Sequence, residues 1–370
     1  MNPLTSLRLN ARDRFIKFYT EDLVRVSRKR NYQRIFPRKA PLCKPLTQQQ
    51  IDEISAFWRP YRPIEKEMKW FAFYNASCTD KSQLKYYIPD NIYFTDFDMM
   101  FTSPRRCNEL DDKNLYDLYF HDVRMPRTYI RKVNGVLFDK EYHAISMDQA
   151  LKICADAGKI VCKDTRMSAG GHGVTFFDFS KCSIEEFKKW IGDPRRVDIN
   201  VQEVIRQHES LGHIHPQSIN SIRTMSFLYE GQVHILSSLI RMGRDGAEVD
   251  NTSQGGISCG IGENGQLGEF GYDEDGNRWA QHPQGAVFKD TRIVGNDKCC
   301  DLIRSLAGRM FTASGLISWD FAVGEDGEPI LIEVNLTYGG LDIHQLCNGP
   351  IFGDMTEEIL STVYLSGKKR

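Results

Sequence analysis

Paired apolar runs around tight turns constrain this chain most, because each pair predicts two antiparallel strands in one sheet. Residues 319–335, WDFAVGEDGEPILIEVN, hold two such runs on either side of a polar, glycine-containing turn. The same pattern occurs at 128–139 and at 221–243. Capped helical patterns lie between these hairpins, at 146–158 and 183–191, and no βαβ unit repeats. The order of elements therefore predicts an α+β fold with mostly antiparallel sheets.

The composition is that of an ordinary globular chain. Of 370 residues, 41% are hydrophobic and 26% are charged, and no run approaches the roughly 18 apolar residues of a membrane-spanning helix. The first residues lack the apolar stretch of a secretory signal. The ten cysteines show no CxxC spacing, which favours reduced thiols over disulfides or a zinc site. The sequence therefore predicts a cytoplasmic protein.

Positive charge is concentrated near the N-terminus. Residues 1–44 hold twelve Lys or Arg and three Asp or Glu, a net charge of +9, although the whole chain carries −1. This segment opens a region, residues 1–110, that we expect to be helix-rich and irregular. A basic helix here fits a solvated cover for another part of the protein, or a surface that meets anionic lipid at the inner membrane face or an acidic glycan. Nucleic acid is not expected as a partner, because no RNA- or DNA-binding module follows.

Three oxygen-bearing side chains share one face of the last hairpin. If its turn centres between Asp326 and Gly327, Asp320 lies opposite Glu333, with Cβ atoms about 5 Å apart. Asn335, two residues beyond Glu333, shares that face. Carboxylate and amide oxygens without Cys or His suit Mg²⁺ better than Zn²⁺. The alternative is the polar outer face of an exposed hairpin, and the motif alone leaves both open.

A glycine-rich loop follows another predicted strand. The stretch VCKDTRMSAGGHGV, residues 161–174, places Lys163 at the end of the strand and Gly170, Gly171 and Gly173 in the loop. Glycines let backbone N–H groups approach phosphate oxygens, and the lysine adds a positive charge. The loop matches neither GxxxxGK[ST] nor GxGxxG, so a phosphate cradle and a plain hairpin turn both remain open.

Further polar residues lie in predicted strands or next to them. Lys113 begins a predicted helix, and Arg223 lies in the middle of an apolar strand, where its charge needs a partner. Arg241 ends the next strand, and Asn251 follows in a glycine-rich loop. The strand VQEVI at 201–205 offers backbone groups that an adenine base can use. Each of these features, taken alone, also has an ordinary structural explanation.

Taken in order, these motifs resemble the ATP-grasp superfamily from residue 113 to about residue 345. The final D…ExN pattern is the most specific part. The runs QEVIRQH…PQSINSIRT and DNTSQGG are most similar to the sugar-transfer-associated ATP-grasp group, and the long hairpin is similar to the glutamate-ligase branch. Two features depart from the pattern: His172 interrupts the glycine loop, and residues 1–110 do not resemble the usual preceding α/β domain.

The resemblance implies an ATP-grasp fold, in which residues 111–204 and 205–370 form two α+β subdomains that clamp ATP. The implied catalytic residues, which neutralise the γ-phosphate and an acyl phosphate, are Arg223, Arg241 and Lys163. The implied nucleotide-binding residues are Lys113, Lys163, Ser168, Gly170, Gly171, Gly173, Gln202, Glu203, Val204, His208, Glu209 and Asn251, with either His208 or Glu209 at the ribose. The implied ligands of Mg²⁺, or of Mn²⁺ as an alternative, are Asp320, Glu333 and Asn335.

The activity that the resemblance implies is ATP-dependent joining of a carboxylate to an amine. Proteins of the sugar-transfer-associated group are typically encoded with capsule or surface-polysaccharide genes. The resemblance therefore implies a role in surface-polysaccharide modification, for example the amidation of a uronic acid carboxyl with an amino acid. A kinase that phosphorylates a sugar or another alcohol would use the same lysines, arginines and Mg²⁺. A third reading is a non-catalytic scaffold that binds a nucleotide or a glycan. The sequence does not identify the carboxylate, the amine or the oligomeric state.

Overall fold

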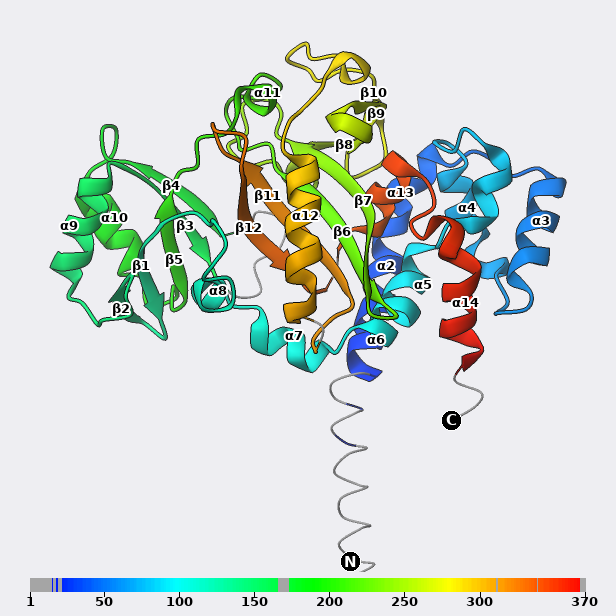
Figure 1. Cartoon of the computed structure of the whole chain (residues 1–370), viewed down its shortest axis with the longest axis horizontal. Coiled ribbons are helices and arrows are strands. Elements are labelled where there is room, and N and C mark those ends of the chain that lie inside the picture. The colour runs from blue at the N-terminus through cyan, green and yellow to red at the C-terminus, as the bar shows by residue number, and fades with distance from the viewer. Residues whose placement is uncertain are drawn as a thin grey trace, which may run out of the picture.

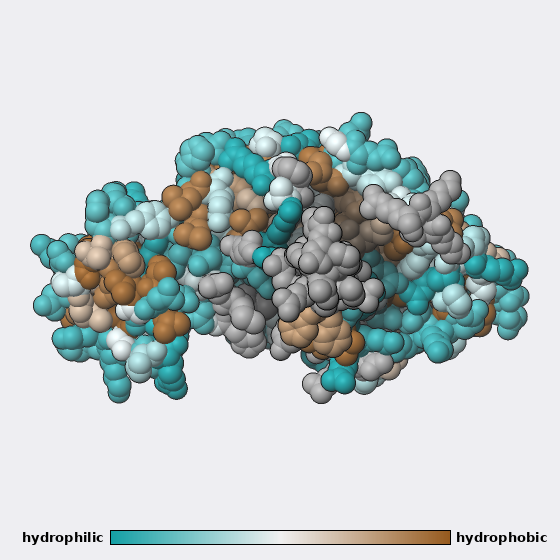
Figure 2. Space-filling model, turned by 90° about the horizontal axis from the view of Figure 1, so that it is seen from below, coloured by the Kyte–Doolittle hydropathy of each residue, from teal (hydrophilic) through white to brown (hydrophobic). Residues whose placement is uncertain are grey.

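The computed structural model describes residues 15, 18, 22–165, 173–310, 312–337 and 339–366. Figure 1 shows a lobe built on a five-stranded sheet, a central seven-stranded sheet, and a group of helices from both ends of the chain. Seen from below in Figure 2, the five-stranded lobe projects from a broader body. All strand pairs are antiparallel, which confirms the predicted α+β class with mostly antiparallel sheets.

The five-stranded sheet has the strand order β2-β1-β5-β3-β4 and carries α9 and α10 on one face. Its strands are β1 (Thr128–Val133), β2 (Val136–Asp139), β3 (Lys159–Asp164), β4 (Val174–Asp178) and β5 (Ile199–Glu203). Its helices are α9 (Met147–Ala157) and α10 (Ile184–Ile191). Alternate residues such as Ile160, Cys162 and Val201 point into the core beneath these helices. The opposite face is therefore left for polar residues, including Lys163.

Local sequence signals define this lobe well. Ser146 and Gln149 form the predicted capping box of α9, and Ser183 begins α10 with a second capping box. The turn between β1 and β2 has Asn134 at φ 49° and Gly135 at φ 83°. Both values lie in the left-handed region that an Asn-Gly hairpin turn requires. Neither the sheet order nor the pairing of β5 between β1 and β3 could be predicted, because both depend on contacts between distant segments.

The seven-stranded sheet has the order β10-β9-β8-β7-β6-β11-β12. Its strands are β6 (Ile222–Tyr229), β7 (Gln232–Met242), β8 (Ile257–Ile261), β9 (Leu267–Tyr272), β10 (Arg278–Trp279), β11 (Leu316–Val323) and β12 (Pro329–Asn335). The long hairpin of β6 and β7 turns at Glu230 and Gly231, as predicted, with φ of 48° and 77°. This hairpin and the one formed by β11 and β12 lie side by side, because β6 pairs with β11.

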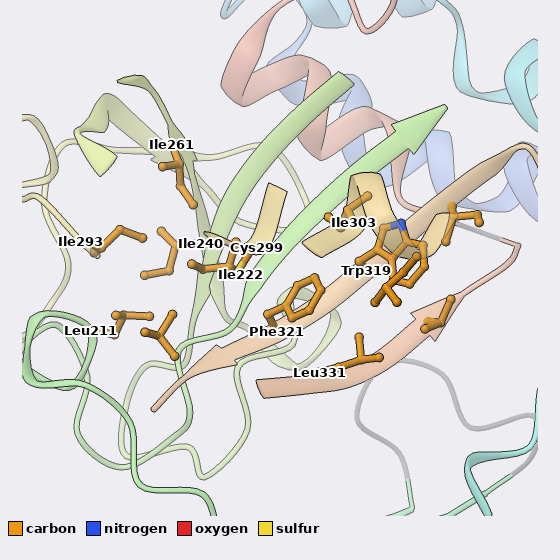
Figure 3. Close-up of a cluster of buried hydrophobic side chains, with 14 of the residues drawn as sticks. Leu211, Ile222, Ile240, Ile261, Ile293, Cys299, Ile303, Trp319, Phe321 and Leu331 are labelled. Carbon is orange, nitrogen blue, oxygen red and sulfur yellow. The ribbon is translucent and has the colours of Figure 1, made fainter. Parts of the chain in front are cut away.

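One face of the seven-stranded sheet packs on α12 (Asn296–Leu306) and α11 (Glu209–Gly212). Figure 3 shows this core, in which Trp319 and Phe321 from β11 meet Leu331 from β12 and residues such as Ile303 from α12. Strict alternation from Val334 along β12 would bring Ile332 into this core, but the register shifts after Asp320, so that Phe321 pairs with Leu331. Leu331 is fully buried and Ile332 only partly. The irregularity leaves the pairing of Asp320 with Glu333 intact.

The other face of this sheet is covered, away from the site, by helices from both ends of the chain. The N-terminal helices on this face are α2 (Leu23–Lys39), α3 (Gln48–Trp58), α4 (Met68–Tyr74), α5 (Asp90–Ile92) and α6 (Asp98–Phe101). Helices α7 (Pro104–Leu110) and α8 (Tyr116–Tyr119) lie instead on the side of α12, where they contribute Cys107 and Tyr116 to the core. The C-terminal helices are α13 (Leu341–Asn348) and α14 (Thr356–Tyr364). Phe71 from α4, Phe227 from β6, Leu341 from α13 and Ile359 from α14 belong to one buried cluster. The region before residue 110 therefore shares a core with the C-terminal part of the chain.

Candidate functional site

The last hairpin places its three oxygen-bearing side chains together, as the sequence predicted. Asp320 on β11 pairs directly with Glu333 on β12. The Nδ2 atom of Asn335 donates to Asp320 Oδ2 at 3.3 Å and to Ser318 O at 3.3 Å. Because Nδ2 is engaged in this way, Oδ1 is the atom of Asn335 that is left to bind a cation. The same face of β6 and β7 carries Arg223 and Arg241.

Asp320 is the centre of a buried ion-pair network. Arg223 donates to it through Nε and Nη2, each at 2.7 Å, and Arg241 donates through Nη2 at 3.2 Å. The Asp320 residue is only 1% exposed. Burial alone would raise the pKa of this carboxyl, but the two guanidinium groups outweigh that effect and lower the pKa to about 2. The mid-strand arginine, whose charge needed a partner, therefore finds it on the neighbouring strand β11.

Arg241 is fixed in place by residues that the sequence did not single out. Its Nε and Nη2 atoms donate to Ser221 Oγ at 3.0 and 2.8 Å, and Asp250 Oδ2 lies 3.7 Å from Nη2. Asp250 in turn accepts from the backbone N–H and the hydroxyl of Ser221. The predicted Asn251 accepts from Arg241 Nη1 at 3.3 Å. The only signal for Asp250 was its position directly before Asn251 in the chain.

Lys113 reaches this network from a short 3-10 helix, Lys113–Leu115, that precedes β1 in the chain. Its Nζ atom lies 2.9 Å from Glu333 Oε1. Burial would lower the pKa of Lys113, but the neighbouring Glu333 outweighs it and the pKa is raised. The backbone N–H of Lys113 donates to Thr165 O at 3.2 Å, at the end of β3. The ion pair therefore joins the five-stranded lobe to β12.

The segment after Lys113 is held against the five-stranded sheet through Asn114. Asn200 on β5 donates to Asn114 Oδ1 at 3.0 Å, and Asn114 Nδ2 donates to Lys132 O at 3.3 Å. Arg131 Nε donates to Asn114 O at 3.2 Å and its Nη2 pairs with Asp117. Asn114 is 1% exposed. These contacts give Lys113 a fixed position, and no sequence motif predicted them.

Lys163 lies on β3, on the polar face of the five-stranded sheet. Burial and, to a smaller extent, the nearby charge of Lys113 lower the pKa of Lys163, and although Glu333, Asp250 and Asp320 act in the opposite direction the net result is a pKa of about 8. Among the residues that the structure describes, no carboxylate lies within ion-pair distance of Lys163. The site therefore holds a partly desolvated lysine that is available to an anion.

The chain matches the family model described as sugar-transfer associated ATP-grasp over residues 94–360. It belongs to this family. The match covers most of the chain and includes every residue that the sequence motifs had singled out. No curated protein matches the chain.

Several solved structures resemble this chain at low identity. D-alanyl-alanine synthetase A from Vibrio cholerae is 13% identical, with a TM-score of 0.44 over 72% of this chain and 68% of that chain. D-cycloserine synthetase DcsG is 15% identical, with a TM-score of 0.40 over 81% and 82%. The ATP-grasp ligase PsnB, solved with a precursor variant, Mg and ADP, is 12% identical, with a TM-score of 0.42 over 81% and 71%. These likenesses concern the fold alone.

The three residues predicted to lie at the hinge are found in β5 and directly after it. Gln202 is buried in the strand and pairs with Thr128 and Val161. The side chain of Glu203 accepts from the backbone N–H of Arg127 at 3.0 Å, so it binds the chain that leads into β1. Val204 follows β5 and is partly buried. Their place at an adenine base stays a prediction.

The two residues expected at the ribose differ in their surroundings. His208 caps α11, where its Nδ1 atom accepts from Ser210 N at 3.1 Å, and its backbone N–H donates to Val323 O. Glu209 is exposed in the first turn of that helix. No hydrogen bond or ion pair within the described part of the chain links either side chain to the Asp320 network. The choice between them stays open.

The glycine-rich loop of this ATP-grasp protein lies mostly outside the described residues. The predicted nucleotide-binding residues Ser168, Gly170 and Gly171 all fall in this part of the loop. Gly173 is described, with φ of 82°, at the point where the loop enters β4. A Cβ atom at this position would lie 2.2 Å from Asp164 Oδ2. Both the dihedral angle and the close approach therefore require glycine at this position.

His344 on α13 also belongs to the surroundings of the site, and no motif predicted it. It is fully buried, and its Nδ1 atom is 2.8 Å from Ser237 Oγ. Burial and the charge of Arg223 lower its pKa to about 3, so the imidazole is neutral beside the arginines. Its Nε2 atom has no hydrogen-bond partner among the described residues. The helix that follows β12 therefore adds a neutral polar group to the charged network.

The oxygen-bearing side chains of this site fit an Mg²⁺ ion that is shared with a substrate, and they do not fit a metal ion that is held by protein side chains alone. No group of three or more His, Cys, Asp or Glu residues in the described ranges is placed to hold a metal ion. The site instead offers two carboxylates, Asp320 and Glu333, with the amide of Asn335 beside them. Mg²⁺ usually takes one or two carboxylates and completes its coordination with waters and substrate phosphates. The predicted ligand set is therefore complete only when a phosphate-bearing substrate is present.

Proposed function

We propose that this ATP-grasp protein is an ADP-forming carboxylate–amine ligase that acts in surface-polysaccharide modification. Its substrates would be a uronic acid carboxyl and the amino group of an amino acid, joined as an amide at the expense of ATP. Family membership supports the use of ATP. The description of the family as associated with sugar transfer supports a glycan carboxylate as one substrate.

The observation that carries this proposal is the charged cluster between the two sheets. Four cations, from Lys113, Lys163, Arg223 and Arg241, surround three carboxylates. Carboxylates and cations in one desolvated place suit Mg²⁺ and phosphate together, because each finds opposite charge there. A site for a neutral glycan would have no need for such a cluster.

The chemistry needs alignment and charge neutralisation more than a nucleophilic side chain. The carboxylate oxygen of the substrate would attack the γ-phosphorus of ATP, break the bond to the β-phosphate oxygen, and form an acyl phosphate with ADP. The amine nitrogen would then attack the carbonyl carbon, lose a proton to solvent and displace phosphate. Mg²⁺ held by Asp320, Glu333 and Asn335 would supply neutralisation of phosphate charge.

The chain's own cations are placed for the two negatively charged stages. Arg223 binds Asp320 through Nε and Nη2, which leaves Nη1 to meet an anionic substrate. Lys163 has no carboxylate within ion-pair distance among the described residues, so a phosphate group would be its first strong partner. Lys113 is already paired with Glu333, and its ammonium group would turn to a phosphate if Glu333 served as a metal ligand.

The test is a matrix of uronic acids against amino acids in the presence of ATP and Mg²⁺. We expect ADP and free phosphate only where both a carboxylate and an amine are present. With a carboxylate labelled with ¹⁸O, one labelled oxygen should appear in the released phosphate, because the acyl phosphate transfers it. If a stable phosphorylated sugar forms without an amine, and no free phosphate is released, the protein is a kinase and the ligase proposal is wrong.

Two variants separate a catalytic site from a non-catalytic scaffold. Asp320→Asn with Glu333→Gln should lower turnover by roughly a thousandfold or more, since both carboxylate ligands of the metal are lost. Glu328→Gln is the matched control on the same hairpin, because Glu328 is exposed and pairs with Lys298. Equal binding of a glycan by the double variant, without turnover by the unchanged protein, would support the scaffold instead.

A further inference from the structure

Helix α2 consists of two unlike halves. Its second half is built into the protein: Phe36 packs against Trp70 with ring centroids 5.0 Å apart, and Lys39 pairs with Asp342 at 2.5 Å. Arg28 is 1% exposed and binds both Phe94 O at 2.9 Å and Asp98 Oδ2 at 2.5 Å. Arg28 is thus the anchor nearest the N-terminus, and before it the helix leaves the body beside α6, as Figure 1 shows.

The part of the chain up to Arg28 exposes an unusual amount of apolar surface. Phe15 is 64% exposed, Phe18 50%, Leu23 39% and Val26 48%. They are four of the ten large hydrophobic side chains that are exposed in the described residues, although the segment spans only 12 positions. Single exposed apolar residues are normal, but a group of this size in one segment indicates a contact surface.

Positive charges are interleaved with these apolar residues. Leu23, Val26 and Arg30 follow the i, i+3, i+7 spacing of one helix face, and Arg25 and Lys29 flank it one turn apart. All three basic side chains are exposed, whereas Arg28 points into the body. The helix therefore offers apolar groups and cations on the same outward side.

We propose that this outward side of α2 docks on an anionic lipid surface. A membrane interface supplies both partners that the helix needs, since acyl chains receive the apolar residues and acidic headgroups pair with the cations. An acidic glycan would satisfy the charges and leave the four apolar residues in water. A second copy of this segment would bring two regions of +9 together, because residues 1–44 carry that net charge.

Neighbouring elements extend the same surface. Met100 on α6 is 47% exposed, and Arg105 and Arg106 on α7 are also exposed. Figure 1 places α6 and α7 at the lower side of the body, next to the point where α2 emerges. No helix in the described ranges is long and apolar enough to cross a bilayer. The contact that we propose is accordingly one at the surface of the membrane.

The test is sedimentation of the full chain with vesicles. Vesicles of phosphatidylcholine with phosphatidylglycerol should bind the protein, vesicles of phosphatidylcholine alone should bind it far less, and high salt should release it. Replacing Arg25, Lys29 and Arg30 by Gln should weaken binding roughly a hundredfold. Val26→Glu should weaken it roughly tenfold or more, because a carboxylate replaces an apolar contact.

Matched controls separate docking from general effects of charge and folding. Val136→Glu, at a valine of 49% exposure in the five-stranded lobe, should leave vesicle binding unchanged. A second control for total charge is the triple replacement of three exposed lysines, Lys181, Lys188 and Lys189, by Gln. The proposal is overturned if the protein binds both kinds of vesicle equally, or if the control variants weaken vesicle binding as much as the α2 variants do. It is also overturned if no vesicle is bound and Val26→Glu instead dissociates a dimer. Binding to a polyuronate but not to anionic vesicles would assign the surface to a glycan instead.

Discussion

Two lysines of the five-stranded lobe point toward the same carboxylate and are in opposite states. Lys113 is paired with Glu333 at 2.9 Å and its pKa is raised. Lys163, on β3, lies farther from that carboxylate, and burial lowers its pKa to about 8. The difference shows which charge is already compensated by the protein. Lys113 is the counterion of Glu333 on the β11–β12 hairpin, whereas Lys163 has no carboxylate within ion-pair distance among the described residues.

The largest effect should come from removing the lysine without a partner. Lys163→Met should lower kcat/KM for ATP roughly a thousandfold, since it removes the cation that meets the phosphates in a desolvated site. Lys113→Met should lower kcat/KM less, by about a hundredfold, because Glu333 already compensates part of the charge of Lys113. Lys159→Met, at the exposed start of the same strand, is the control and should change little. Equal losses for Lys113→Met and Lys163→Met would contradict the distinction.

The comparison extends to the two carboxylates, which differ in burial. Asp320→Asn leaves two guanidinium groups without their counter-charge in a place that is 1% exposed, and should destabilise the protein by about 3 kcal/mol. Glu333→Gln should cost about 1 kcal/mol, because its side chain is 23% exposed. Urea denaturation of both variants measures these losses. Asp326→Asn, which breaks an exposed pair with Arg124, gives the baseline, and a loss at Asp320 no larger than this baseline would refute the buried network.

Much of this network follows from the sequence, and the reasons are local. The pairing of Asp320 with Glu333 could be counted through the turn, because an antiparallel hairpin fixes which residues are opposite. The same count misplaced Ile332, since a register shift after Asp320 has no signature in the letters of the strand. The hairpin at Glu230 and Gly231 and the capping box at Ser146 were equally readable from nearest neighbours.

What could not be predicted depends on contacts between distant segments. The partner of Arg223 required knowing that β6 lies beside β11. Asn114 looks like any polar residue at a helix start until Asn200 on β5 is placed against it. His344 lies only nine residues after Asn335, yet its neutral state depends first on burial and then on Arg223 and Arg241 from two other strands. The motifs therefore identified the groups that meet substrate better than those that hold them.

The pH dependence of nucleotide binding distinguishes the two lysines directly. Below pH 8 the free protein carries a protonated Lys163, and above it the lysine must take up a proton when it meets phosphate. The Kd for ATP with Mg²⁺ should therefore rise about tenfold per pH unit above pH 8, up to the pKa of Lys163 in the complex. Lys163→Arg, always charged, should remove this slope, whereas Lys113→Arg should leave it. Calorimetry in two buffers of different ionisation enthalpy measures the proton uptake. If no proton is taken up above pH 8, the pKa of Lys163 is not lowered in the free protein.

The smallest expected effect comes from the residue that holds Lys113 and does not touch Lys163. Asn114→Ala removes the hydrogen bonds to Lys132 O and from Asn200, and should cost about 1 kcal/mol of stability. Because Lys113 then keeps its charge and loses its fixed position, KM for ATP should rise a few-fold while the slope of Kd above pH 8 stays unchanged. Asn200→Ala should act in the same way, and the double variant should cost less than the sum, since one shared contact is lost. A changed pH slope in Asn114→Ala would mean that Lys163 depends on the same support, and the two lysines would then work as one unit.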